Sequence, residues 1–546
     1  MSEHMVDEGV VDDIDSDANQ LQKLGIKQQF HRTIGAFDSF ASSFCAVNFI
    51  GSVRLSFFIG ILAGGPLAMW SSFLVNCVAV CITSAILAEI CSALPISGSL
   101  YIWAAAAAGV KYGRIVGFVV AWWIVTSWMS ALAVTCQGVA LYVLSLLTVY
   151  NSNFPGGISN SNVKWRAVMW ITSEGILALS TLVNYLPPRA YAILFRGSMV
   201  VILLDFFLCL IWLPIGVSRT YGLRTAREAF LATYDGTGAP AGWNWMLSFL
   251  FTSFILVGFD AAGHVAEETK NASVVAGRSI FRSAVATAVG GLAALILFLF
   301  CTPTIEILFS LNAPQPFVLI YSMALGHGGA VAMTLIAALG AMSSVAIMIL
   351  AASRIIFAIA RDGALPFSSW VATVTPNGRP QNAVTVVFVC TALLLCVILP
   401  SASAFTSLMS GVTVPFIASY GIVALFRLFV TPNEFRNTKF PLGRARRLLY
   451  AISVLFNGMA FVVTVSPFTF PVTAANLNFG GVIFGAITIF GLLSYWFTPE
   501  ERWLPREKIR EMCDGANGMV GEAEVGEMSQ DRNGNGTSDT QEAEKD

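Results

Sequence analysis

Twelve apolar stretches, each long enough to cross a lipid bilayer, restrict the fold of this chain more than any other feature of its sequence. A transmembrane helix needs about 20 predominantly apolar residues to cross roughly 30 Å of hydrocarbon. Because every backbone polar group must be satisfied in lipid, stretches of this length predict an all-α polytopic membrane protein with about twelve transmembrane helices. They lie near residues 34–62, 67–92, 114–147, 167–186, 190–217, 243–263, 283–302, 330–358, 383–400, 404–429, 447–468 and 476–497.

The distribution of charge divides the chain into three parts. Of its 546 residues, 56% are hydrophobic and 12% are charged, whereas soluble proteins have about 45–50% and about 25%. Residues 31–498 hold 23 Lys and Arg against 12 Asp and Glu, and the two flanking segments hold 8 against 20. We therefore expect a twelve-helix membrane domain at 31–498 between two disordered acidic tails, 1–30 and 499–546. Nothing in this balance points to a nucleic-acid partner.

The basic residues between the stretches predict the orientation in the membrane. An even number of spans places both tails on one side. If the tails are cytosolic, the connections on that side carry fourteen Lys and Arg and the opposite connections carry five. Since basic residues are retained in the cytosol, we expect both termini to be cytosolic. We expect the plasma membrane, with the vacuolar membrane as the alternative.

No pattern in the sequence indicates an enzyme or a cofactor site. The ten Cys lie mostly inside apolar stretches and the four His are dispersed. The sequence has no nucleophile–base arrangement, no metal-ligand spacing and no phosphate loop of the form GxxxxGK[ST]. We expect neither catalysis nor a bound metal.

Two stretches contain residues that interrupt a helix. In the sixth, Gly258 and Gly263 flank Asp260, and in the first, Gly51-Ser52 precede Arg54. A helix broken inside a protein core frees backbone N–H and C=O groups that can bind a polar ligand. Two discontinuous helices in corresponding places of two halves are typical of a transporter site.

Ionisable residues within the stretches are expected to have a functional or structural role, because a charge in hydrocarbon costs roughly 2.5–3.5 kcal/mol on insertion scales. Arg54 either binds a substrate carboxylate or forms a structural ion pair. Asp205, in the fifth stretch, either carries a proton or attracts an ammonium group, or it pairs with Arg54 or Arg196. Glu267 and Glu268 follow the sixth stretch and form either a cytoplasmic gate with Arg278 or Arg354 or a solvated helix end.

Three further polar residues have two interpretations each. Ser343 and Ser344, in the eighth stretch, either line a pathway and hold a cation against the first span, or allow close packing of helices. His264 is either a hydrogen-bonded polar residue or a proton relay.

Three motifs resemble a known family. The run GFDAAGHVAEETKNAS (258–273) is similar to the sixth-span signature of the amino acid–polyamine–organocation superfamily. GGPLAMW (64–70) with AEICSALP (88–95) resembles its fungal branch of amino acid, GABA and choline permeases. SRIIFAIARDGALPFSSW (353–370) resembles the segment that follows span eight in that superfamily.

This resemblance implies two inverted five-helix repeats of the LeuT type plus two extra helices, with the substrate held between spans one, three, six, eight and ten. It places one break at Ile50, Gly51, Ser52 and Val53, where N–H groups would bind a substrate carboxylate. It places the other at Val257, Gly258, Phe259 and Asp260, where carbonyl groups would face an amino group and Phe259 would act as a gate. Arg54 departs from the family pattern, and Arg196 is the basic residue of the span where proton-driven relatives have a Lys.

The function implied is that of a secondary active permease that imports amino acids or related amines such as GABA, choline or polyamines. Proton symport with alternating access is the expected mechanism, with H⁺ as the coupling ion. The alternative is a nutrient sensor that has the same fold but does not transport.

The predicted orientation can be tested at the sequons Asn271-Ala-Ser and Asn535-Gly-Thr. Both face the cytosol in this topology, so we expect neither to be glycosylated. Electrophoresis before and after glycosidase treatment checks this, and a mass shift traced to either Asn would contradict the topology.

Overall fold

A computed structural model describes residues 28–518 except 188, 377, 401–403 and 474–476. Most of the expected acidic tails, residues 1–27 and 519–546, lies outside the described residues. Within the described part, twelve segments are helical, long and apolar enough to cross a membrane. The expectation of an all-α polytopic membrane protein with twelve spans is confirmed.

Ten of the spans are single helices or nearly so, and the first and sixth consist of two helices each. The spans are α2 (Ala36–Val47) with α3 (Phe49–Leu62), α4 (Gly65–Ala93), α6 (Gly109–Val149), α7 (Val163–Val183), α8 (Arg189–Arg219), α10 (Ala241–Leu256) with α11 (Ala261–His264), α12 (Ala272–Cys301), α14 (Pro316–Arg361), α16 (Gln381–Leu395) with η2 (Cys396–Ile398), α17 (Ala404–Phe429), α18 (Arg446–Val465) and α19 (Gly480–Phe497). The shorter elements are α5 (Leu100–Ala107), α9 (Ala226–Leu231), η1 (Ala266–Glu268), α13 (Ile305–Ser310), α15 (Ser368–Val371), η3 (Gly443–Ala445) and α20 (Arg506–Asn517).

The first ten spans form two sets of five with corresponding packing partners. α4 packs on α12 and α6 packs on α14, so the second and third spans contact their counterparts, the seventh and eighth. α6 also packs on α17, just as its counterpart α14 packs on α8. Because five crossings end on the side opposite to the start, the two sets run in opposite directions. This arrangement is the inverted repeat, and α18 and α19 are the two extra helices.

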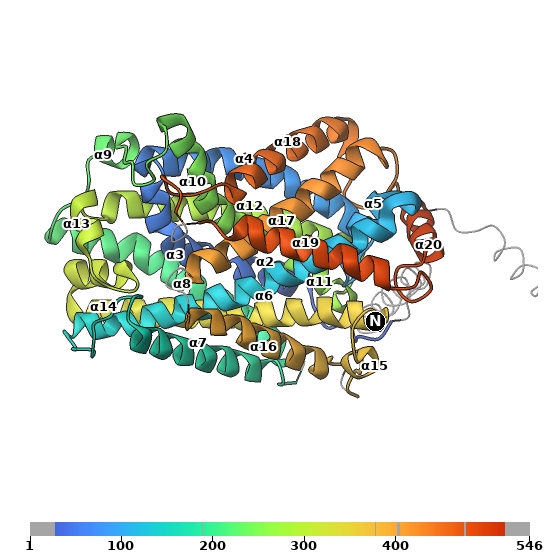
Figure 1. Cartoon of the computed structure of the whole chain (residues 1–546), viewed down its shortest axis with the longest axis horizontal. Coiled ribbons are helices and arrows are strands. Elements are labelled where there is room, and N and C mark those ends of the chain that lie inside the picture. The colour runs from blue at the N-terminus through green and yellow to red at the C-terminus, as the bar shows by residue number, and fades with distance from the viewer. Residues whose placement is uncertain (1–27, 188, 377, 401–403, 474–476, 519–546) are drawn as a thin grey trace, which may run out of the picture.

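The two broken spans lie in the interior of the bundle. In their most apolar parts, 89% of the residues of α10–α11 and 72% of those of α2–α3 are buried, against 33% for α7 and 11% for α19. Figure 1 shows α2 and α12 in the middle, with α4 and α18 along one side and α7 and α16 along the other. The intact helices therefore separate the broken ones from lipid, as free backbone groups require.

The short helices gather at the two ends of the bundle. Figure 1 shows α9 and α13 at one end, and α5, α15 and α20 at the other, which we call the α20 end. The first described residues lie at the α20 end too: Phe30 is buried, and its ring centroid lies 4.9 Å from that of Phe357, near the end of α14.

The structure corrects the expectation that disorder begins at residue 499. Trp503 and Leu504 are buried, and α20 buries a stripe formed by Ile509, Met512, Cys513 and Ala516. Lys508 Nζ lies 2.8 Å from Asp362 Oδ1, just beyond α14. Composition alone does not predict this docked helix, because its charged residues outnumber its apolar ones. The apolar residues recur at the spacing of one helix face, and the charged residues occupy the other face.

Two truncations test the docked segment. Removal of residues 499–546 should lower the unfolding temperature by several degrees, since each buried apolar side chain contributes about 1.5–3 kcal/mol. Removal of 519–546 alone should leave it unchanged. Thermal unfolding of the purified protein in detergent checks both, and equal stability of the two truncated chains would contradict the docking.

Candidate functional site

The break in the sixth span occurs at the residues predicted for it. α10 ends at Leu256, Val257 is extended (φ −98°, ψ 163°), and Gly258 has a φ of +86°. The helix resumes after Asp260 as α11. A left-handed φ favours glycine, which has no Cβ to clash with the backbone, so Gly258 fixes the position of this break.

The break in the first span occurs at Asn48, two residues before the predicted start at Ile50. Asn48 has left-handed angles (φ 45°, ψ 68°), and its Oδ1 accepts a hydrogen bond of 3.3 Å from the Gly51 N–H. Asn tolerates this conformation and is a preferred N-cap. Ile50, Gly51, Ser52 and Val53 therefore belong to the first turns of α3, which corrects the prediction. The Asn three residues before Gly51 was the signal that was overlooked.

A cavity with a volume of about 40 Å³ lies between the two breaks. Its wall comes from spans one, three, six, eight and ten, the five that the resemblance implies. Of the residues predicted for the site, Ser52, Val257 and Gly258 line it, and none of the described lining residues is charged. The lining residues are Ala46, Val47, Ser52, Trp128, Ala131, Thr135, Phe254, Val257, Gly258, Met348, Val412 and Phe416.

Helix ends determine the electrostatics of this cavity. α2 ends beside it at Ala46 and Val47, and α10 ends beside it at Val257 and Gly258. The last carbonyl groups of a helix have no partner within the helix, and they give its C-terminus a partial negative charge. The first turn of α3 also borders the cavity at Ser52 and carries the opposite partial charge, and the Ser52 hydroxyl donates to the Val47 carbonyl at 2.8 Å. The C-terminus of α10 is therefore the helix end that favours a positively charged ligand.

Asp260 lies behind the second break in a buried hydrogen-bond network. Its Oδ1 accepts a hydrogen bond of 2.6 Å from the Tyr420 hydroxyl, and its Oδ2 lies 2.9 Å from His264 Nε2. The Tyr420 oxygen accepts from the Gly258 N–H at 3.2 Å. Phe259 stacks on Tyr420 with ring centroids 5.0 Å apart. Tyr420 thus joins Asp260 to the broken backbone, a role that no motif in the sequence predicts.

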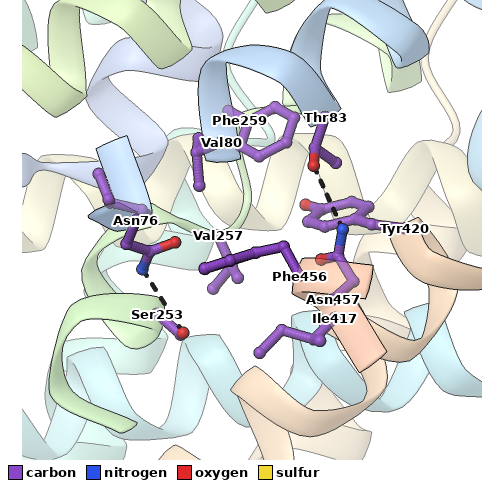
Figure 2. A pocket seen from close by; sticks show the side chains of 11 residues that line it. Asn76, Val80, Thr83, Ser253, Val257, Phe259, Ile417, Tyr420, Phe456 and Asn457 are labelled. Atoms are coloured by element: carbon purple, nitrogen blue, oxygen red, sulfur yellow. Dashed lines mark hydrogen bonds between the residues drawn. The ribbon is translucent and has the colours of Figure 1, made fainter. Parts of the chain in front are cut away.

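A second cavity, with a volume of about 20 Å³, also has Val257 in its wall. Figure 2 shows hydrogen bonds at two places in its wall, from Asn76 to Ser253 and from Asn457 to Thr83. Tyr420 forms part of the same wall. The broken segment of span six therefore contributes Val257 to the walls of both cavities.

Arg54 and Asp205 form a buried ion pair away from both cavities. Arg54 Nη1 donates to Asp205 Oδ1 at 2.9 Å and to the Tyr321 hydroxyl at 2.8 Å, and its Nη2 also contacts Asp205. The Arg54 side chain is 1% exposed, and the Tyr142 ring centroid lies 5.5 Å from its guanidinium carbon. Of the two interpretations of Arg54, the structure supports the structural ion pair, which joins α3, α8 and α14.

Three other predicted residues also lie outside both linings. Arg196 pairs with Asp38 at 3.0 Å, and its side chain is 63% exposed. The hydroxyls of Ser343 and Ser344 donate to the Gly340 carbonyl of their own helix. This is the arrangement expected for close packing, and a Cβ added at Gly340 would lie 4.0 Å from Asn48 Nδ2.

Glu267 and Glu268 form two buried ion pairs at the α20 end. Glu267 Oε2 lies 2.9 Å from Arg361 Nη1, and Glu268 Oε1 lies 2.7 Å from Arg354 Nε. The Ser97 N–H also donates to Glu267 at 3.0 Å. These contacts connect the end of span six to the end of α14, so the segment is not a solvated helix end.

Comparisons with known proteins agree with this geometry. The family model described as "Amino acid permease" matches residues 34–493. The chain is 41% identical to "Thiamine transporter thi9" of Schizosaccharomyces pombe, over 95% of this chain and 92% of that protein. It is 26% identical to "Amino-acid permease BAT1" of Arabidopsis thaliana, over 91% and 97%. A manganese transporter of Eremococcus coleocola, at 13% identity, shares the fold with a TM-score of 0.54, covering 87% and 95% of the chains.

Variants of the buried ion pair test the role given to Arg54. Arg54→Met leaves the Asp205 carboxylate buried without its partner, which should cost about 3–5 kcal/mol. The double variant Arg54→Met with Asp205→Leu should recover most of that loss, because it removes both charges. Thermal unfolding in detergent measures both. Equal destabilisation by the single and double variants would contradict the structural role.

Proposed function

Because the chain belongs to the amino acid permease family, we propose that it is a secondary active transporter for a small organic cation, and that the cation is thiamine. Transport itself follows from the family and from the fold of its structural neighbours. The cavity between the two breaks supports the finer proposal.

The charge around the cavity carries this proposal. The C-terminus of α10 faces it, and its described lining contains no Lys or Arg. Arg54, the cation that could have bound a substrate carboxylate, is already neutralised by Asp205. Such a site stabilises a positive ligand and offers no side-chain cation to an anionic one.

The aromatic and sulfur-containing wall favours a flat cation. The rings of Trp128 and Phe416 lie 5.6 Å apart at the centroids, and Met348 lies in the same wall. Aromatic faces attract cations, most strongly at Trp, and thioethers pack well on rings. Thiamine is a permanent cation with two aromatic rings and no carboxylate, and one relative bears the name of a thiamine transporter.

An amino acid is the second candidate. The first turn of α3 lies beside the cavity at Ser52, and N–H groups in a first helical turn have no partner within the helix. They could bind a carboxylate, although Asn48 already occupies the Gly51 N–H. Several relatives are named amino-acid permeases, which also supports this candidate.

We further propose import across the plasma membrane coupled to protons, with the α20 end in the cytosol. The pairs Glu267–Arg361 and Glu268–Arg354 would then close the path to the cytosol. Opening inward requires these charges to separate, and water entering the path would solvate them.

Uptake of labelled thiamine tests the substrate. In cells without their own thiamine uptake, the chain should confer saturable uptake that excess unlabelled thiamine blocks and that amino acids, GABA, choline and polyamines do not. Trp128→Leu should weaken the apparent affinity by roughly 2- to 30-fold, the equivalent of about 0.5–2 kcal/mol of cation–π attraction.

Trp496→Leu is the matched control, because Trp496 is 80% exposed on α19, and it should transport normally. Saturable uptake of a labelled amino acid without uptake of labelled thiamine would replace the substrate with the second candidate. Substrate binding without uptake into proteoliposomes would favour a sensor.

A further inference from the structure

Asp260 and His264 form an acid–imidazole pair inside the protein. Both side chains are 0% exposed, they are four residues apart across α11, and their facing atoms are 2.9 Å apart. Neither residue lines the substrate cavity or the second cavity. The pair is therefore ionisable, buried and separate from the place where a substrate would sit.

The hydrogen bonds of His264 depend on where one proton is placed. The Trp128 Nε1–H, which can only donate, lies 3.2 Å from the same Nε2 that faces Asp260. If Nε2 carries hydrogen, it donates to the Asp260 carboxylate and Trp128 loses its acceptor. If Nε2 is bare, it accepts from Trp128, and a proton must lie on Asp260 for the two groups to attract. His264 Nδ1 has no hydrogen-bond partner among the described residues.

The groups around Asp260 and His264 do not compensate the negative charge of an ionised Asp260. Around the pair, α17 contributes the Tyr420 hydroxyl, α6 the Trp128 indole, and α2 the Ser43 hydroxyl, which accepts from the Ala262 N–H. The remaining charged groups on neighbouring elements are either already paired or exposed: Glu267 with Arg361, Glu268 with Arg354, and Arg278 and Arg282 of α12 on the surface. An ionised Asp260 beside a neutral His264 is then a buried, uncompensated charge, which is costly. One added proton neutralises it.

We propose that Asp260 and His264 together bind the proton that drives transport, and that Tyr420 transmits its presence to the substrate cavity. This rests on the proposed transport function. A proton taken from solution converts the ionised pair to a net-neutral pair, and its release restores the carboxylate. Hydrogen bonds to an ionised acceptor are stronger than those to a neutral one. With the added proton on Asp260, the bond from Tyr420 to Asp260 weakens and frees the tyrosine, which also accepts a hydrogen bond from Gly258 at the cavity wall.

Proteoliposomes held at zero membrane potential test the proposal with thiamine as the probe. For one proton per substrate, a gradient of one pH unit should produce about tenfold accumulation in the wild type, since 1.4 kcal/mol corresponds to a factor of ten. His264→Gln and Asp260→Asn should reduce the accumulation ratio to about one, while thiamine still raises the unfolding temperature of each variant. Tyr420→Phe should reduce accumulation while preserving the fold.

His327→Gln is the matched control, because His327 is exposed on α14, and it should accumulate thiamine as the wild type does. Full pH-driven accumulation by His264→Gln or Asp260→Asn would overturn the proposal. If either variant fails to fold, the other and Tyr420→Phe decide the matter by the same measurement.

A measurement without substrate separates failure of this proposal from failure of the thiamine assignment. The unfolding temperatures of the wild type and of His264→Gln should differ by an amount that changes with pH, because only the wild type has the complete proton site. A difference that stays constant with pH would overturn the proton site whatever the substrate is. A changing difference without thiamine uptake would retain the proton site and reject thiamine.

Discussion

The need to satisfy backbone polar groups away from water governs the rest of this structure. Each unsatisfied N–H or C=O costs several kcal/mol in hydrocarbon, so a span can break only where protein surrounds it. The broken spans are accordingly well buried, at 72% and 89% of their most apolar parts, whereas α7 and α19 face outward. Side chains satisfy some of the backbone N–H groups at the two breaks. The Asn48 side chain accepts from the Gly51 N–H, and the Tyr420 oxygen accepts from the Gly258 N–H. At the cavity the Ser52 hydroxyl likewise donates to the Val47 carbonyl.

Buried ion pairs lie on both sides of the breaks, and one of them, Glu89 with Arg427, joins the two repeats. Arg54 of α3 pairs with Asp205 of α8 beyond the first break, whereas the pairs of Glu267 and Glu268 lie at the α20 end. At that end Glu89 also binds Arg427 and the Tyr450 hydroxyl, which joins α4, α17 and α18. A buried pair is weak evidence for stability but strongly penalises the loss of one partner. Ion pairs suit contacts that open during transport, because water that enters the path solvates the separated charges. Water does not stabilise separated apolar side chains in this way.

The sequence predicted those features that a single segment determines. Apolar length gave the twelve spans, and Gly258, whose conformation excludes most other residues, gave the second break. The predicted position of the first break is wrong because the prediction rests on Gly51. In the structure Asn48 adopts the left-handed conformation and also caps the next helix. The choice between two roles for Arg54 could not be made, because its partner lies 151 residues away. Tyr420 was missed for the same reason, since nothing in α17 marks it as the partner of Asp260.

A transporter that carries a cation together with a proton must hold two positive charges in one protein interior. The Asp260–His264 pair reduces the repulsion between them. Two positive charges close together in a medium of low dielectric constant repel strongly. A proton that binds to an aspartate–histidine pair changes the charge of the pair from −1 to zero, so a substrate cation beside a loaded pair has a neutral neighbour and not a positive one. Arg196 could not serve in this way, because it is exposed and paired with Asp38. Tyr420 contacts both Asp260 and the backbone of Gly258, so the proton can influence the substrate site through one side chain without entering it.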